Sequence, residues 1–66
     1  MNITLNGEAY ELPGPTTVAA LLALLHLDAR RVAVEHNLTV VKRAAFDTIE
    51  LKEGDEVEIV NFVGGG

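Results

Sequence analysis

The chain has 66 residues, of which 48% are hydrophobic, and its ten acidic and five basic side chains give a formal net charge of −5. A chain of this length forms one domain with a small core, which leaves little room for an internal catalytic pocket. The negative charge argues against a nucleic-acid partner. The absence of cysteine excludes disulfides, thiolate metal sites and a sulfur atom carried on a side-chain thiol.

The apolar segments are too short to cross a membrane. The longest is the eight-residue run 18–25, whereas a spanning helix needs about 20 apolar residues. No basic segment leading into an apolar one opens the chain, so nothing indicates export. We therefore expect a cytoplasmic protein without a membrane partner.

Residues 1–12 predict a β-hairpin. Hydrophobic and polar residues alternate over 1–6, and Asn6-Gly7 is a favoured pair for a two-residue hairpin turn. The alternation resumes at Tyr10 and Leu12, and the sequence Pro13-Gly14-Pro15 ends the second strand.

A short helix follows the prolines. Thr16 or Thr17 can cap its first turn. The apolar side chains then repeat at i, i+3, i+4 and i+7, which predicts a helix of two to three turns with one face on a sheet. These positions are Val18, Leu21, Leu22 and Leu25.

The second half of the chain predicts three further strands. Residues 32–35 and 40–42 form a second hairpin around Asn37, and Glu53-Gly54-Asp55 turns the chain into a last strand. In that strand the side chains of Val57 and Ile59 should face the core. A right-handed crossover through the helix lets the first and last strands lie parallel in the middle of one mixed sheet. The fold class is therefore α+β, with one helix packed on about five strands.

The last three residues, Gly64, Gly65 and Gly66, directly follow the apolar run 57–63. Glycine contributes no packing and loses much entropy on folding, so a triple glycine here is better explained by reach than by stability. Together with Val63 the tail spans at most ~13 Å. It could carry the terminal carboxylate into the active site of a partner. The alternative is an ordinary frayed end.

Several segments together resemble the ThiS family, the sulfur carriers of thiamine biosynthesis, which belong to the ubiquitin-like β-grasp group. The resemblance covers the whole chain. It implies a β-grasp domain over residues 1–63 and a flexible tail over 64–66. Leu38 departs from the glycine that commonly follows the turn asparagine, and Lys42 from a frequent proline. The segments that carry the resemblance are the helix opening 16–22, the strand 32–34 with Asn37, the turn 53–57 and the ending 62–66.

The resemblance implies a carrier rather than an enzyme, with no permanently bound cofactor. An E1-like adenylyltransferase of the ThiF type would adenylate Gly66 with Mg-ATP, while Gly64 and Gly65 thread into its active site. A persulfide loaded by a cysteine desulfurase would convert the adenylate to a thiocarboxylate. A thiazole synthase of the ThiG type would then accept the sulfur. The open alternatives are a carrier of the molybdopterin-synthase small-subunit type, a ubiquitin-like protein modifier and a passive binding domain.

The last strand also suggests a docking surface. Its alternation places Val60 and Phe62 on the face away from the helix, where an apolar side chain beside the tail could anchor a partner. The alternative is that the strand ends at Asn61 and Phe62 seals the core.

The remaining charged and ionisable side chains predict no further site. His26, at the helix end, and His36, in a hairpin turn, have no metal-ligand spacing, so we expect no metal site. Acidic residues gather on and beside the last strand, either steering a basic partner or forming a solvated sheet edge. They are Glu50, Glu53, Asp55, Glu56 and Glu58.

Overall fold

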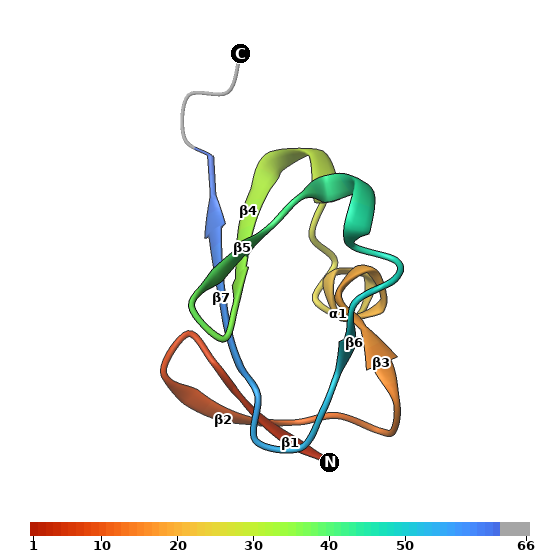
Figure 1. The fold of residues 1–66 in the computed structure, drawn as a ribbon, viewed down its shortest axis with the longest axis vertical. Coiled ribbons are helices and arrows are strands. Elements are labelled where there is room, and N and C mark those ends of the chain that lie inside the picture. Colours follow the sequence, from red (N-terminus) through yellow and green to blue (C-terminus); the bar gives the residue numbers. More distant parts are fainter. Residues whose placement is uncertain (63–66) are drawn as a thin grey trace.

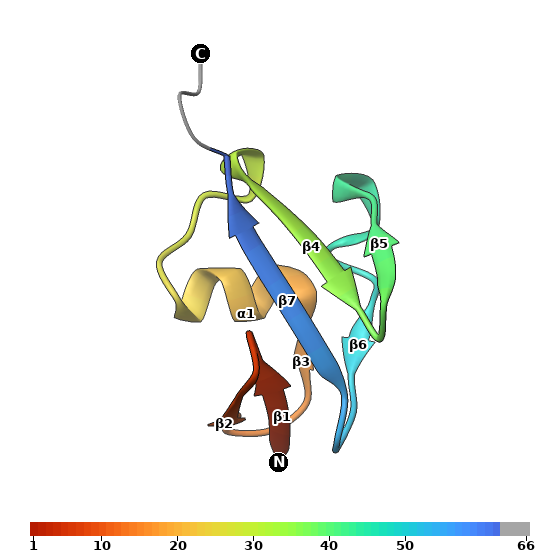
Figure 2. The ribbon, with the colours of Figure 1, turned by 90° about the vertical axis from the view of Figure 1, so that its left-hand side faces the viewer.

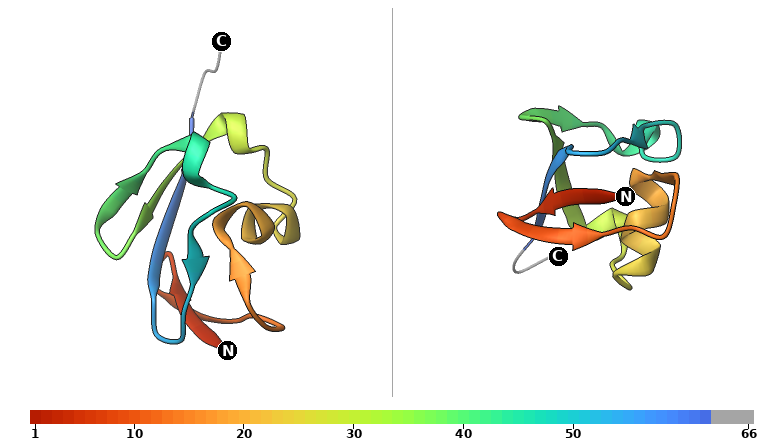
Figure 3. Two further views of the ribbon diagram at one scale, coloured as in Figure 1. Left: turned by 45° about the vertical axis from the view of Figure 1, so that its right-hand side comes forward. Right: turned by 90° about the horizontal axis from the view of Figure 1, so that it is seen from below.

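The computed structural model describes residues 1–62. One helix, α1 (Val18–Leu24), packs against a five-stranded mixed sheet with the order β2-β1-β7-β4-β5 (Figure 1). Figure 3 shows the sheet and the helix as two layers. The strands are β1 (Asn2–Leu5), β2 (Glu8–Glu11), β4 (Val32–His36), β5 (Thr39–Val41) and β7 (Glu56–Asn61).

The centre of the sheet confirms the predicted topology. The first and last strands, β1 and β7, run parallel, with Thr4 opposite Glu56 and Leu5 opposite Val57. The pairs β1–β2, β4–β5 and β4–β7 are antiparallel. The last strand of the chain is therefore held in the middle of the sheet, between β1 and β4.

Both predicted hairpin turns are present, and both need left-handed backbone angles. Asn6 and Gly7 have φ angles of 51° and 83°, as a two-residue turn between twisted strands requires. Asn37 and Leu38 have φ angles of 50° and 69°. Leucine is disfavoured in this region because of its Cβ atom, so the second turn is built against the preference of Leu38.

The helix begins at Val18, directly after Thr17, which is one of the two predicted N-cap residues. The Thr17 side chain accepts a hydrogen bond from the Ala20 N–H at 3.0 Å. Thr16 instead lies in the short strand β3 (Thr16–Thr17), which pairs with β6 (Glu50–Leu51) as a separate two-stranded sheet. The sequence did not predict this pair, because two residues are too short to show a hydrophobic period.

The core lies between α1 and the sheet. Five of its predicted members are buried on α1 and β7, whereas Leu25, just after α1, is only half-buried. Within residues 1–62 no helix is long and apolar enough to cross a membrane. The buried hydrophobic residues are Ile3, Leu12, Val18, Leu21, Leu22, Val32, Val34, Phe46, Leu51, Val57 and Ile59.

Candidate functional site

The strand β7 ends at one extreme of the part of the molecule that the structure describes (Figure 2). β1 pairs with β7 only as far as Val57, while β4 pairs with it as far as Asn61. The next residue continues along β4, since the Phe62 N–H donates to the Arg31 carbonyl at 2.8 Å. The predicted tail residues Gly64, Gly65 and Gly66 lie outside the described residues, as does the predicted domain boundary after residue 63.

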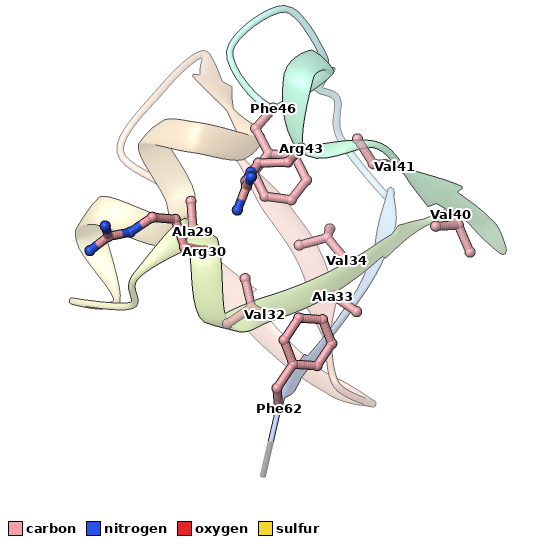
Figure 4. Close-up of a pocket in the computed structure, with 10 residues that line it drawn as sticks. All are labelled: Ala29, Arg30, Val32, Ala33, Val34, Val40, Val41, Arg43, Phe46 and Phe62. Carbon is pink, nitrogen blue, oxygen red and sulfur yellow. The ribbon is translucent and has the colours of Figure 1, made fainter. Parts of the chain in front are cut away.

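The side chains of β7 alternate between the core and the outside, as the sequence predicts. Val57 and Ile59 are 1% and 9% exposed, whereas Val60 and Phe62 are 62% and 59% exposed. In Figure 4 the Phe62 ring lies on the opposite side of β4 from the buried Phe46. Phe62 is therefore on the outer side of the sheet and does not close the core. Its role in docking stays a prediction.

The neighbouring strands extend this exposed surface. Ala33 of β4 lies opposite Val60, and Glu35 lies opposite Val40 of β5. We define the outer apolar face as Ala33, Val40, Val60 and Phe62, all of which are exposed. The sequence indicated only the two members on β7, because the contribution of β4 and β5 depends on strand register.

The structure divides the predicted acidic cluster into two kinds of residue. Asp55 is mostly buried, and its carboxylate accepts hydrogen bonds from the Lys52 N–H at 2.9 Å and Asn37 Nδ2 at 3.2 Å. His36 Nε2 lies 2.7 Å from the same carboxylate. Asp55 therefore joins the turn before β7 to the β4–β5 hairpin. By contrast Glu50, Glu53, Glu56 and Glu58 are exposed.

This contact also corrects the position of His36. The sequence placed it in the hairpin turn, but it is the last residue of β4 and pairs with Asp55 from there. The two residues are 19 positions apart, so no local pattern could join them. Within residues 1–62 no group of three or more His, Asp or Glu side chains could hold a metal ion.

Opposing effects set the pKa of Asp55. Partial burial raises it, but hydrogen bonds from His36, the Lys52 N–H and Asn37 outweigh that effect. The net result is a pKa below the ordinary value, so the carboxylate is ionised at neutral pH.

Two arginine side chains lie near Phe62, the last described residue. Arg30 and Arg43 line a shallow pocket of about 300 Å³ together with Phe62 (Figure 4). Arg30 is paired with Asp28, whose carboxylate lies 3.0 Å from Nη2 and 3.2 Å from Nε, and this hydrogen bonding lowers the pKa of Asp28 to about 2. The turn 52–55, with its acidic residues, lies at the opposite end of the molecule (Figure 1).

Comparison with known proteins identifies the family. The sequence matches the ThiS family over residues 3–66, which includes the glycine ending. The chain belongs to the ThiS family. This membership confirms the family predicted from the sequence.

Individual relatives agree with this assignment. The sulfur carrier protein ThiS of Bacillus subtilis is 37% identical over 65 residues, which is 97% of this chain and 98% of that protein. A crystal structure of the thiamine biosynthesis protein ThiS from Geobacter metallireducens superposes with a TM-score of 0.86 at 42% identity, covering 100% of both chains. The predicted β-grasp fold is therefore confirmed.

A second group of relatives is much longer. A thiazole synthase of Paramagnetospirillum magneticum and another of Magnetococcus marinus are each 42% identical to this chain over 66 residues. The match covers 100% of this chain but only 20% of either protein, so the chain spans a fifth of the length of these relatives.

Proposed function

We propose that this chain is a sulfur carrier for thiamine biosynthesis, in which the Gly66 carboxylate is adenylated, converted to a thiocarboxylate and used to supply sulfur for thiazole formation. The observation that supports this most directly is the family match that runs to residue 66 and so includes Gly64, Gly65 and Gly66. The absence of cysteine is consistent with sulfur held on the main chain.

The chemistry explains why a partner enzyme is needed. A carboxylate is a poor electrophile, because its charge is delocalised and oxide is a very poor leaving group. An E1-like adenylyltransferase of the ThiF type would join Gly66 to the α-phosphate of ATP and release pyrophosphate. A persulfide would then displace AMP and form an acyl disulfide. A second thiol of the partner reduces this bond, which leaves the thiocarboxylate on Gly66 and a disulfide on the partner.

The following step uses the nucleophilicity of the thiocarboxylate, which is more polarisable than a carboxylate. A thiazole synthase of the ThiG type is the proposed acceptor. The two longer relatives support this choice, because both are named thiazole synthase and both contain a segment that matches this whole chain. A carrier and a synthase joined in one polypeptide would act in one reaction sequence. Because activation consumes ATP and uses a cysteine desulfurase, we place the protein in the cytoplasm.

Docking in this scheme uses the exposed end of β7. Val60 and Phe62 are the proposed anchors, since they are apolar, exposed and adjacent to the tail. Buried aromatic anchors commonly carry a large share of the binding energy of an interface.

The experiment that tests the proposal is an intact-mass measurement. The protein is incubated with its adenylyltransferase, Mg-ATP, a cysteine desulfurase and cysteine, and a parallel sample lacks ATP. We expect the replacement of one oxygen by sulfur at the C-terminus only when ATP is present. Unmodified chain in a system that activates another ThiS protein would overturn the proposal, and isopeptide adducts would favour a protein modifier.

A further inference from the structure

One edge of β7 is covered by a side chain instead of a strand. β1 ends at Leu5, and Asn6 then turns away into the hairpin. The side-chain amide of Asn6 continues the pairing in place of the backbone. Its Oδ1 accepts from the Ile59 N–H at 2.8 Å, and its Nδ2 donates to the Ile59 carbonyl at 3.3 Å. Asn6 therefore acts as one further strand residue and ends the pairing there.

The next outward-facing backbone groups on this edge belong to Asn61. In an antiparallel pair, alternate residues direct both their N–H and C=O toward the same neighbouring strand. Phe62 donates toward β4, and Ile59 is bonded on the β1 side, so Asn61 shares the direction of Ile59. No residue between 1 and 62 pairs with the N–H or the carbonyl of Asn61, which is exposed.

An apolar groove of about 300 Å³ lies beside these backbone groups. It is lined by Leu5, Leu25, Leu27 and Ile59, together with the two asparagines, and the leucines are half-buried. Figure 2 shows the segment that follows α1 on this side of β7, beyond the end of β1. Within residues 1–62 the site thus combines an unpaired donor, an unpaired acceptor and an apolar hollow, which is what an added β-strand uses.

We propose that this edge binds an extended segment of the adenylyltransferase, which pairs with Asn61 as an added strand and places an apolar side chain in the groove. The inference rests on the proposed function. The four residues after Phe62 span at most ~13 Å, so an enzyme that holds Gly66 at its nucleotide must lie close to this edge. Pairing with Asn61 would fix the direction of the tail at its base, and adenylation requires such alignment at the α-phosphate.

Total chemical synthesis allows a backbone test in a chain of this length. Replacing Asn61 by its α-hydroxy acid converts the 60–61 amide to an ester, which removes the N–H and leaves the side chain. The matched control is the same replacement at Ala9, whose N–H faces the open edge of β2, far from the tail. An ester carbonyl is a weaker hydrogen-bond acceptor than an amide carbonyl. Each replacement therefore weakens one sheet hydrogen bond, at the carbonyl of Val60 or of Glu8, and the two effects on stability should be similar.

The readout is ATP–pyrophosphate exchange by the adenylyltransferase as a function of carrier concentration. We expect the ester at Asn61 to raise KM for the carrier about tenfold, with the ester at Ala9 within about twofold of wild type. Equal KM values for both esters would overturn the strand-addition inference alone. Absence of exchange with the wild-type chain would overturn the proposed function together with this inference.

A second pair of variants tests the contribution of the groove. Leu27→Ala removes a groove side chain, whereas Leu24→Ala removes a leucine of α1 that is 47% exposed and lines a different hollow. A rise in KM of about tenfold for Leu27→Ala only is expected if an apolar side chain enters the groove. Hydrogen exchange supplies the direct observation, because the Asn61 amide should be protected only in the complex. A rise in KM for Leu27→Ala with an Asn61 amide that stays unprotected would indicate a non-strand ligand in the groove and would overturn the inference.

Discussion

At the scale of single residues, Asp55 connects segments that are distant in sequence. It receives hydrogen bonds from Lys52 and Asn37, and Asn37 Oδ1 in turn accepts from the Glu56 N–H at 2.8 Å. This network fixes the entry to β7 on the β4–β5 hairpin. The sequence pattern groups Asp55 with acidic residues that either steer a partner or form a solvated sheet edge, whereas its contacts in the structure assign it a structural role.

Asp55→Asn should lower the free energy of unfolding at pH 7 by about 1–3 kcal/mol, since it removes a charged acceptor from a mostly buried network. Because the folded-state pKa of Asp55 is below the ordinary value of 3.8, its contribution is fully present above that pH and is lost as the pH falls through the folded-state pKa. Urea unfolding between pH 2 and 7 should therefore show the two proteins converging in acid. Asp47→Asn, at an exposed site, should stay within about 0.5 kcal/mol of wild type at pH 7. A constant difference between Asp55→Asn and wild type across this range would contradict the linkage.

Leu38 is the residue whose backbone angle conflicts most with its side chain. It has a φ of 69° and is 82% exposed, so it gains little from burial. Leu38→Gly should raise the free energy of unfolding by about 0.5–1 kcal/mol, because relief of the left-handed strain exceeds the entropy cost of glycine. Leu38→Ala keeps the Cβ atom, so it should not show this increase in the free energy of unfolding. Thermal melts of both variants decide the matter, and a lower melting temperature for Leu38→Gly would show that Leu38 makes a stabilising contact.

At the scale of elements, β4 separates two phenylalanines with different expected roles. Phe46 is 4% exposed on the core side, and Phe62 is 59% exposed on the outer side (Figure 4). The same substitution at the two positions can therefore distinguish packing from docking.

Phe62→Ala should weaken binding to the adenylyltransferase or thiazole synthase by about 1–3 kcal/mol and leave the melting temperature nearly unchanged. Phe46→Ala should lower the free energy of unfolding by about 3–5 kcal/mol, because it opens a cavity in the core. Calorimetric titration and circular-dichroism melts measure the two effects. A large fall in melting temperature for Phe62→Ala with unchanged affinity would place its role in the fold.

At the scale of the whole molecule, charge is distributed unevenly along the axis that ends at the tail. Arg43 lines the same pocket as Phe62, the last described residue (Figure 4). Lys52 instead donates its N–H to Asp55 within the acidic turn 52–55, which lies at the other end of the molecule (Figure 1). The net charge of −5 therefore does not describe the surface that a partner meets at the tail. A partner with an acidic entrance would complement that surface.

Arg43→Glu and Lys52→Glu change the net charge equally, so they form a matched pair. We expect Arg43→Glu to slow association with the adenylyltransferase several-fold at low salt, and Lys52→Glu to have a smaller effect. The difference should disappear near 1 M salt, where the screening length is about 3 Å. Stopped-flow measurement of the on-rate tests this. Faster association of both variants would instead favour steering by the acidic end.

The tail and the fold should be separable by mutation. Deletion of Gly66, or Gly65→Val, should leave the unfolding transition almost unchanged, since glycine has no apolar side chain to bury and chain ends usually carry little stability. Activation should nevertheless be lost. Deletion of Gly66 leaves the terminal carboxylate about 3.5 Å short of the nucleotide, and the β-branched side chain of Gly65→Val restricts the backbone of the tail. ATP–pyrophosphate exchange is measured beside circular-dichroism melts of the same variants. Wild-type rates of ATP–pyrophosphate exchange in both variants would mean that the glycine tail is only a chain end. Loss of folding together with loss of exchange would assign the tail a structural role.

Much of the fold could be predicted from the sequence because its signals are local. The Asn6-Gly7 turn, the Thr17 cap and the alternation of Val57 and Ile59 each depend on a few neighbouring residues, and each is present in the structure. The parallel pairing of β1 with β7 followed from the handedness of the helix crossover. The family also followed from sequence, since motifs in order along the whole chain are specific even where each is weak.

The tertiary structure alone decided which distant groups meet. The pairing of His36 with Asp55, the extension of the outer apolar face to Ala33 and Val40, and the Asn6 side chain on Ile59 all depend on register and on turns far apart in sequence. A shift of one residue in any strand would send each side chain to the other face, and no local pattern specifies that choice. The composition determines the net charge, but only the packing of η1 (Ala29–Arg31) and η2 (Arg43–Ala45) near the end of β7 puts two arginines in one pocket with Phe62.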